Sequence, residues 1–157
     1  MELTVEPVRS FEDFYRTEWA GLRRAVALVL DDRELARACV EEAMGRACER
    51  WARVAATGRP AGWVYREALE AARRRGRREG GRGRPLAVVP GGTLADPEMA
   101  AALGRLTLDQ RSLVVLRFYL DWSTEDVAQA VGLPSGSVAD RLQQALRRLE
   151  SALREST

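Results

Sequence analysis

The most regular hydrophobic pattern lies in the C-terminal third of the chain, where apolar residues recur with a helical period from Leu106 to Leu153. They divide into three helices, and the last carries one apolar stripe made of Val138, Leu142, Ala145, Leu146, Leu149 and Leu153. The middle helix is short: Ser123 and Asp126 form a capping box at its start, and Gly132 ends it, because glycine takes a left-handed conformation at little cost. Its predicted buried residues are Val127, Ala128 and Val131. A short helix turning tightly into a longer one predicts a helix-turn-helix, although a helical hairpin in an ordinary bundle would show the same pattern.

Three further helices are predicted in the N-terminal half. An amphipathic helix over residues 11–30 has an apolar stripe rich in aromatic side chains, among them Phe14, Tyr15 and Trp19. A second helix is expected from Arg33 to about Val54. A third begins at Pro60, because proline is favoured in the first turn of a helix, and it ends in a run of arginines. Together with the C-terminal helices, they predict an all-α fold.

The two groups of helices are separated by a segment without a sustained period. This segment is rich in Gly, Arg and Pro, with glycine at positions 80, 81, 83, 91 and 92. Such a composition is typical of a flexible linker between small domains. We therefore predict a three-helix N-terminal domain over residues 1–79, a linker over 80–103 and a C-terminal helix-turn-helix domain over 104–157.

Positive charge is concentrated around the end of the third predicted helix. Residues 59–84 contain 9 arginines and 3 acidic residues, a net charge of +6, whereas the whole chain has a net charge of +2. A basic helix end suits phosphate groups, although a solvated helix end running into a linker is the alternative. The candidate DNA contacts of this kind are Arg73, Arg74, Arg77 and Arg78. Tyr65 lies close to them and could either stack on an exposed base or belong to the core, while Trp63 is expected in the core.

The composition disfavours catalysis. The chain contains no His and no Lys, so it lacks the usual general base, the commonest metal ligand and the amine of Schiff-base chemistry. We therefore expect no catalytic site, no metal and no cofactor. Cys39 and Cys48 are nine residues apart in one predicted helix, which places them on opposite sides of it. A reduced, cytoplasmic protein without a signal peptide or membrane anchor is expected.

Several motifs resemble those of the extracytoplasmic-function sigma factors of bacterial RNA polymerase, in particular the short actinobacterial type. In the N-terminal half they are Val40-Glu41-Glu42-Ala43, Arg46-Ala47, Arg50-Trp51 and Pro60-Ala61-Gly62-Trp63-Val64-Tyr65-Arg66. In the C-terminal half they are residues 106–119, Asp121-Trp122-Ser123, Gly136-Ser137-Val138 and Arg141-Leu142. The resemblance implies an N-terminal domain that binds core polymerase and opens the start-proximal promoter element. It also implies a C-terminal domain that reads the upstream element in the major groove.

The resemblance further implies two sets of site residues. The polymerase-facing candidates are Glu41, Glu42 and Arg46. The DNA-facing candidates of the C-terminal domain are Thr124, Ser137, Asp140, Arg141, Gln143 and Gln144, and those of the N-terminal domain are Tyr65 and the four arginines named above. On the face of this helix opposite the apolar stripe, residues 137, 140, 141 and 144 point away from the core, and Arg141 is the only cation among them. It is therefore expected to carry most of the base readout. The implied partners are core RNA polymerase, promoter DNA and an anti-sigma or other regulatory protein.

The sequence departs from the family pattern at several of these positions. In the second helix, the family usually has an acidic residue and Gln where this sequence has Ala38 and Glu41, respectively. In the third helix, it usually has Asn and Asp where this sequence has Glu70 and Arg74. In the recognition helix, Ala139 and Asp140 stand in place of Lys and Ser. Residues 105–157 contain 7 arginines and 7 acidic residues, so weak binding of DNA alone is expected, which delivery by polymerase can offset. A transcription initiation factor is the leading hypothesis, a degenerate sigma-like regulator acting through a protein partner is the alternative, and a hydrolase or transferase is the third.

Overall fold

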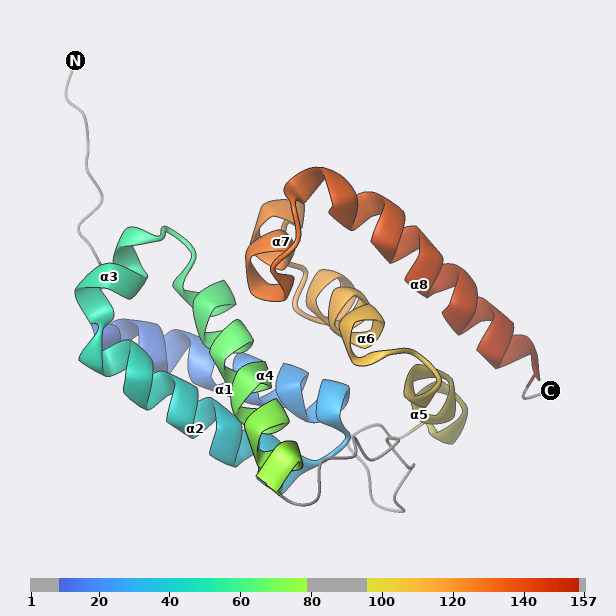
Figure 1. The fold of residues 1–157 in the computed structure, drawn as a ribbon, viewed down its shortest axis with the longest axis horizontal. Coiled ribbons are helices and arrows are strands. Elements are labelled where there is room, and N and C mark those ends of the chain that lie inside the picture. The colour runs from blue at the N-terminus through green and yellow to red at the C-terminus, as the bar shows by residue number, and fades with distance from the viewer. Residues whose placement is uncertain (1–8, 79–95, 156–157) are drawn as a thin grey trace.

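The computed structural model of the chain describes residues 9–78 and 96–155, and every regular element in these ranges is a helix (Figure 1). The N-terminal half contains α1 (Phe11–Leu30), α2 (Arg33–Glu49), α3 (Trp51–Ala56) and α4 (Pro60–Arg78). The C-terminal half contains α5 (Pro97–Gly104), α6 (Leu108–Val114), the π-helical turn η1 (Val115–Tyr119), α7 (Thr124–Val131) and α8 (Ser135–Glu155). The predicted all-α fold class is confirmed. Within the described ranges, no helix combines the length and the apolar character needed to cross a bilayer.

α1 forms where the apolar period predicts it, and polar side chains fix its ends. Ser10 accepts a hydrogen bond from the backbone N–H of Asp13 at 3.1 Å, and Asp31 ends the helix in the left-handed region with φ of 51°. Phe14 is fully buried, whereas Tyr15 is 37% exposed and stacks on Trp19. The predicted aromatic stripe therefore lies only partly in the core.

The second predicted helix is interrupted before its expected end. The backbone of Arg50 leaves the helical region, with φ of −119° and ψ of 28°, and separates α2 from α3. The next residue, Trp51, turns toward α1: its indole N–H donates to the backbone carbonyl of Arg9 at 2.9 Å, and its ring packs edge-on against Phe11. The periodicity predicts one continuous helix because this tertiary contact has no local signal.

The predicted linker over residues 80–103 is wrong at its C-terminal end, because α5 begins inside it. Asp96 caps this helix by accepting from the backbone N–H of Glu98 at 3.0 Å, and Pro97 occupies its first turn. The helix is held by an apolar cluster of Ala102, Leu103, Leu106, Leu149 and Ala152. A helix of 8 residues is too short to show a sustained apolar period, and its stability depends on such tertiary packing. Residues 80–95 lie outside the described ranges.

The predicted helix-turn-helix is confirmed in α7 and α8. Ser123 accepts from the backbone N–H of Asp126 at 3.2 Å, and Gly132 ends α7 with φ of 71°. The periodicity predicts that Val131 is buried, but Ala130 is the buried residue, because α7 packs against α4 as well as against its own half. A capping box, in which Thr107 and Gln110 exchange hydrogen bonds, starts α6. The sequence analysis does not predict it.

We expect Gly132→Ala to lower the free energy of unfolding by about 1–2 kcal/mol, because an alanine is strained in the left-handed region. The added Cβ would lie 3.5 Å from the Arg66 guanidinium, an ordinary contact, so backbone strain and not a clash causes the loss. The matched control is Gly45→Ala, whose Cβ meets nothing within 4 Å inside α2. It should stabilise the protein by about 0.5–1 kcal/mol. Denaturant unfolding measures both, and equal effects would contradict the assigned role of Gly132.

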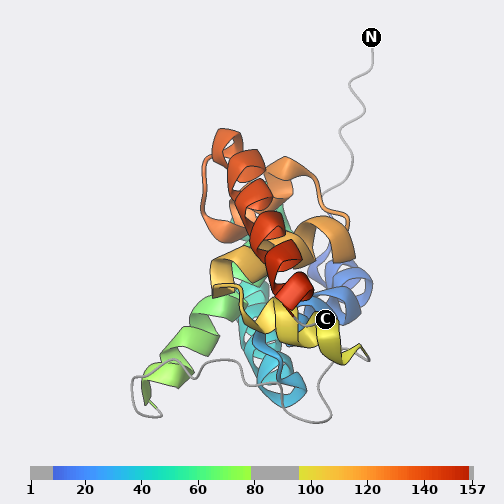
Figure 2. The same cartoon turned by 90° about the vertical axis from the view of Figure 1, so that its right-hand side faces the viewer.

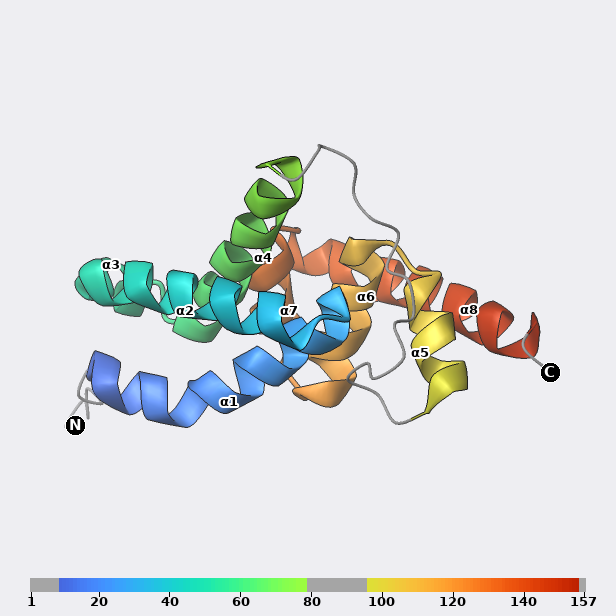
Figure 3. The same cartoon turned by 90° about the horizontal axis from the view of Figure 1, so that it is seen from below.

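The two halves pack tightly against each other. α4 lies beside α7 and reaches α6 through the side chains of Tyr65 and Arg73, while α8 lies on the outer side of the molecule (Figures 1 and 2). α1 and α2 run side by side and support α4, which Figure 3 shows from below. One apolar core continues from the N-terminal half into the C-terminal half, and it includes Val64, Tyr65, Ala68, Leu113, Leu116, Val127 and Ala130. This packing decides which of the predicted site residues are accessible.

Candidate nucleic-acid and polymerase interface

α8, the second helix of the helix-turn-helix, presents a polar face to solvent. Val138, Ala145 and Leu149 are buried, as their stripe predicts, and they fix the orientation of the helix. The predicted contacts Asp140, Arg141, Gln143 and Gln144 are exposed, and Ser137 is half-buried. Thr124 is half-buried at the start of α7. The fold therefore brings the predicted DNA-facing residues of α8 together on one exposed surface.

Two arginines that the sequence analysis does not single out extend this surface. Arg147 and Arg148 are exposed, and Arg148 follows Arg141 by seven residues, or about two helical turns. Arg141, Gln144 and Arg148 consequently form one row along the helix. Within the described ranges, no ion pair involves Arg141, Arg147 or Arg148. The spacing from Arg141 is the sequence signal that could have found Arg148.

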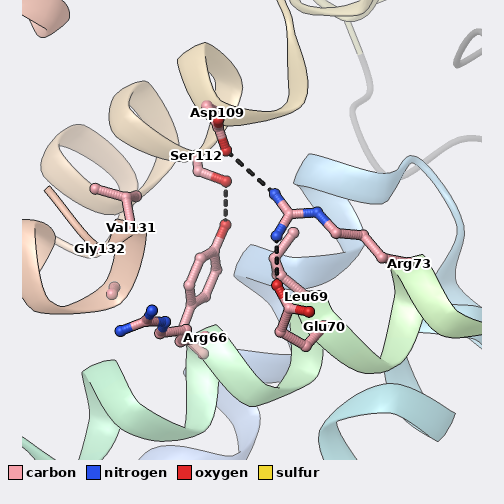
Figure 4. A pocket seen from close by; sticks show the side chains of 10 residues that line it. Arg66, Leu69, Glu70, Arg73, Asp109, Ser112, Val131 and Gly132 are labelled. Atoms are coloured by element: carbon pink, nitrogen blue, oxygen red, sulfur yellow. Dashed lines mark hydrogen bonds and ion pairs between the residues drawn. The ribbon is translucent and has the colours of Figure 1, made fainter.

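Three arginines near the end of α4, namely Arg73, Arg74 and Arg75, are paired with acids within the molecule, contrary to the expectation of a free cationic surface. Arg73 donates to Glu70 on its own helix at 2.7 Å and to Asp109 of α6 at 3.3 Å (Figure 4). Arg74 and Arg75 each lie 3.7 Å from the carboxylate of Glu42 in α2. Only the backbone of Arg77 and Arg78 is described, as the last two residues of α4. A local charge count cannot reveal this pairing, because acids from α2 and α6 supply the opposite charge.

The polymerase-facing candidates on α2 divide into two kinds. Glu42 pairs with Arg46 at 3.4 Å as well as with the arginines of α4, and Arg46 also donates to Glu67 of α4 at 3.1 Å. These two residues therefore hold α2 against α4. Glu41 is exposed, and its partner is Arg37 on the same helix at 3.3 Å. Of the three candidates, Glu41 is the one that faces solvent.

Tyr65 is a core residue in this structure and not an exposed base-stacking platform. Its side chain is 1% exposed, its hydroxyl lies 2.6 Å from the Ser112 hydroxyl of α6, and its ring meets Trp122 edge-on. Burial raises the pKa of the Tyr65 phenol, and the hydrogen bond with Ser112 opposes that rise. Trp63, expected in the core, is half-buried. The pattern left both interpretations of Tyr65 open because its partner lies 47 residues away.

Alkaline titration should show this burial directly. Because the pKa of Tyr65 is raised in the folded state, its packing stabilises the fold fully below the ordinary tyrosine value of about 10, and the contribution is lost as pH rises above it. We expect one phenolate absorbance step to be delayed and to coincide with loss of structure. Tyr65→Phe should remove this step, whereas Tyr119→Phe should retain it. A delayed step that survives in Tyr65→Phe would contradict the assignment.

Arg111 forms a second buried link between the halves. It is 4% exposed and donates to the backbone carbonyl of Val29 near the end of α1 and to that of Leu106 at 3.0 Å. The last carbonyls of a helix lack intrahelical partners, and α1 has no basic residue in its last turn, so Arg111 supplies both the donor and the charge. Burial lowers the pKa of Arg111, and the nearby charge of Asp31 opposes this effect. Nothing in the sequence pattern distinguishes this arginine from exposed ones.

α4 and α7 approach each other closely at Gly62 of α4. A Cβ at this position would lie 3.2 Å from Cγ of Gln129 and 3.4 Å from the backbone carbonyl of Asp126, both in α7. Just before α4, Arg59 donates to the Asp126 carboxylate at 2.7 Å. The absence of a side chain at Gly62 therefore allows α4 and α7 to pack closely, and the ion pair ties the same ends together.

No group of three or more His, Cys, Asp or Glu residues within the described ranges could hold a metal. Cys39 is buried and Cys48 is exposed, and both are free thiols. Burial raises the pKa of the Cys39 thiol.

Comparison with known proteins gives consistent matches along the chain. A family model described as sigma-70, region 4 matches residues 98–149. The RNA polymerase sigma-E factor of Streptomyces coelicolor is 30% identical over 159 residues, which cover 93% of this chain and 87% of that protein. The ECF RNA polymerase sigma factor SigL of Mycobacterium tuberculosis is 35% identical over 57 residues, 36% of this chain and 32% of that protein. Among solved structures, the sigma factor RpoE of Bartonella quintana, in complex with the anti-sigma factor NepR, gives a TM-score of 0.66. It is 25% identical, and the match covers 91% of this chain and 98% of that chain.

Proposed function

This chain belongs to the extracytoplasmic-function sigma factors of bacterial RNA polymerase, and on that premise we propose that it binds core polymerase and directs it to promoters whose upstream element is read by α8. The observation that carries this proposal is the exposed row of Arg141, Gln144 and Arg148 on the second helix of a helix-turn-helix. In such motifs the second helix lies in the major groove. The site itself thus offers DNA readout, and family membership supplies the polymerase.

Each residue of the row has a role that follows from its chemistry. Arginine pairs in bidentate fashion with guanine and glutamine with adenine, so Arg141 and Gln144 are proposed to read bases. Arg148 lies further along the helix and is proposed to contact phosphate. Asp140 repels phosphate or accepts a hydrogen bond from cytosine, and Ser137 donates to phosphate near the helix start.

The two halves are proposed to act as separate units on polymerase. α2 would face the polymerase through Glu41, because Glu42 and Arg46 are engaged in holding α2 to α4. α4 would contact the start-proximal promoter element, and the C-terminal half the upstream element. The protein would act in the cytoplasm, where bacterial polymerase works. An anti-sigma protein is a candidate partner, because the sigma factor RpoE of similar structure was solved with one.

Run-off transcription tests the proposal. Core polymerase would be combined with genomic promoter fragments in the presence and absence of this protein, and discrete transcripts should depend on its addition. Copurification with core polymerase would be measured on the same preparations. Stable polymerase binding without any discrete transcript would instead favour the sigma-like regulator. The equal numbers of arginines and acids in residues 105–157 support this second candidate, because they predict weak binding of DNA. Failure of both measurements would reject the proposed function.

A further inference from the structure

We propose that Asp140 of α8 selects a cytosine at one position of the upstream promoter element and excludes guanine and thymine from that position. The inference rests on the proposed function in one respect, namely that α8 lies in the major groove. It adds which base one side chain of this helix selects, and it assigns specificity to an acid in a helix that binds a polyanion.

Asp140 points more directly away from the buried stripe of α8 than Arg141 does. Successive residues of an α-helix are rotated by about 100°, so the buried Leu149, nine residues further on, lies about 180° from Asp140. The buried Val138 lies about 160° from it by the same count, whereas Arg141 is only about 80° from Leu149. Asp140 is also in the N-terminal part of α8, and in a helix-turn-helix the N-terminal residues of the second helix contact base edges. The carboxylate therefore faces the bases, with Arg141 beside it.

The charge of Asp140 is not compensated inside the protein. Its side chain is exposed, and among the residues that the structure describes it forms no ion pair and no side-chain hydrogen bond. The other two acids of α8 are both paired, Glu150 with Arg154 and Glu155 with Arg105. No cation stands three or four positions from Asp140, where helical side chains meet, because these residues are Gly136, Ser137, Gln143 and Gln144.

The hydrogen-bonding groups of the bases decide which of them an ionised carboxylate tolerates. A carboxylate only accepts hydrogen bonds. In the major groove guanine presents two acceptors, and thymine presents an acceptor beside its methyl group, so both repel Asp140. Adenine presents a donor beside an acceptor, whereas cytosine presents its amino group as a donor without a neighbouring acceptor. Cytosine is therefore the base that suits Asp140 best.

The phosphates of DNA strengthen this selection. They repel the unpaired carboxylate at every sequence and so lower the affinity of α8 for DNA in general. A hydrogen bond from cytosine offsets part of that cost, and the other bases leave it uncompensated or increase it. Because a single hydrogen bond is involved, we expect a preference for cytosine of roughly 5- to 10-fold, at the lower end of what one mismatched base pair costs.

Selection from a library of DNA duplexes with randomised positions tests the proposal. The full-length protein would be used without polymerase and at low salt, where electrostatic binding is strongest. The unmodified protein should enrich cytosine at one position, roughly 5- to 10-fold over guanine and thymine. Asp140→Asn keeps the size of the side chain and adds a donor. Since asparagine pairs with both N6 and N7 of adenine, the preference should change from cytosine to adenine at that position alone.

A matched control separates base selection from a general change of charge. Glu150→Gln removes the same charge from the same helix, but from an acid that pairs with Arg154. It should leave every base preference unchanged. The proposal is overturned if Asp140→Asn likewise changes no base preference and only raises the affinity for all sequences. It is also overturned, with the proposed function intact, if the unmodified protein selects bases at other positions but cytosine at none. An absence of any base preference would contradict readout by α8 and therefore the proposed function as well.

Discussion

Replacing Arg141 by alanine is expected to impair promoter-specific initiation strongly while the fold and the association with polymerase remain intact. Arg141 is exposed, and within the described ranges it forms no ion pair, so its removal leaves no buried group without a partner. A bidentate contact to guanine contributes about 1–3 kcal/mol of discrimination, which corresponds to a loss of roughly 5- to 150-fold at the matching promoter. Run-off transcription at limiting protein concentration measures the loss.

The control for Arg141 is another arginine of the same helix. Arg154→Ala removes the same charge and side-chain type near the C-terminal end of α8, where Arg154 pairs with Glu150. It should retain initiation within about twofold, since surface pairs of this kind contribute little. The combination of Ala139→Lys with Asp140→Ser should tighten binding to DNA at low salt, because it makes the DNA-facing surface more positive. If Arg141→Ala supports normal transcription, the C-terminal half is not the promoter reader, and the regulator hypothesis takes precedence.

Arg111→Ala is expected to be the most destabilising of the substitutions considered. It leaves two buried carbonyls, those of Val29 and Leu106, without their charged donor. Hydrogen bonds to charged groups contribute about 1.5–3 kcal/mol each, so a loss of about 3 kcal/mol is a conservative expectation. For a protein of this size that corresponds to a fall in Tm of roughly 6–12 °C.

The comparison for Arg111 is an exposed arginine. Arg37→Ala breaks a single pair with Glu41 on the surface of α2 and should change the free energy of unfolding by less than about 0.5 kcal/mol. Thermal unfolding followed by circular dichroism distinguishes the two. Similar Tm values for Arg37→Ala and Arg111→Ala would show that the buried link between α1 and α6 contributes nothing to stability.

The N-terminal charge pattern illustrates how far local sequence can go. The excess of arginine over residues 59–84 correctly locates the basic end of α4, but it does not show that Glu42, Glu70 and Asp109 lie against it. Two of these acids come from other helices. A net charge describes a segment, whereas an electrostatic surface depends on what packs beside that segment.

The sequence by itself determined α1, α4, α7 and α8, the helix-turn-helix and the family, because these depend on local signals: an apolar period, a cap such as Ser123 and a glycine at a turn such as Gly132. It also determined the outward face of α8, since one buried stripe fixes the rest of a helix. Only the tertiary structure decided that Tyr65 is buried, that Arg73 is neutralised and that Arg111 caps α1. The partners in these contacts lie 36 to 82 residues apart, and no periodicity along the chain connects residues across such distances.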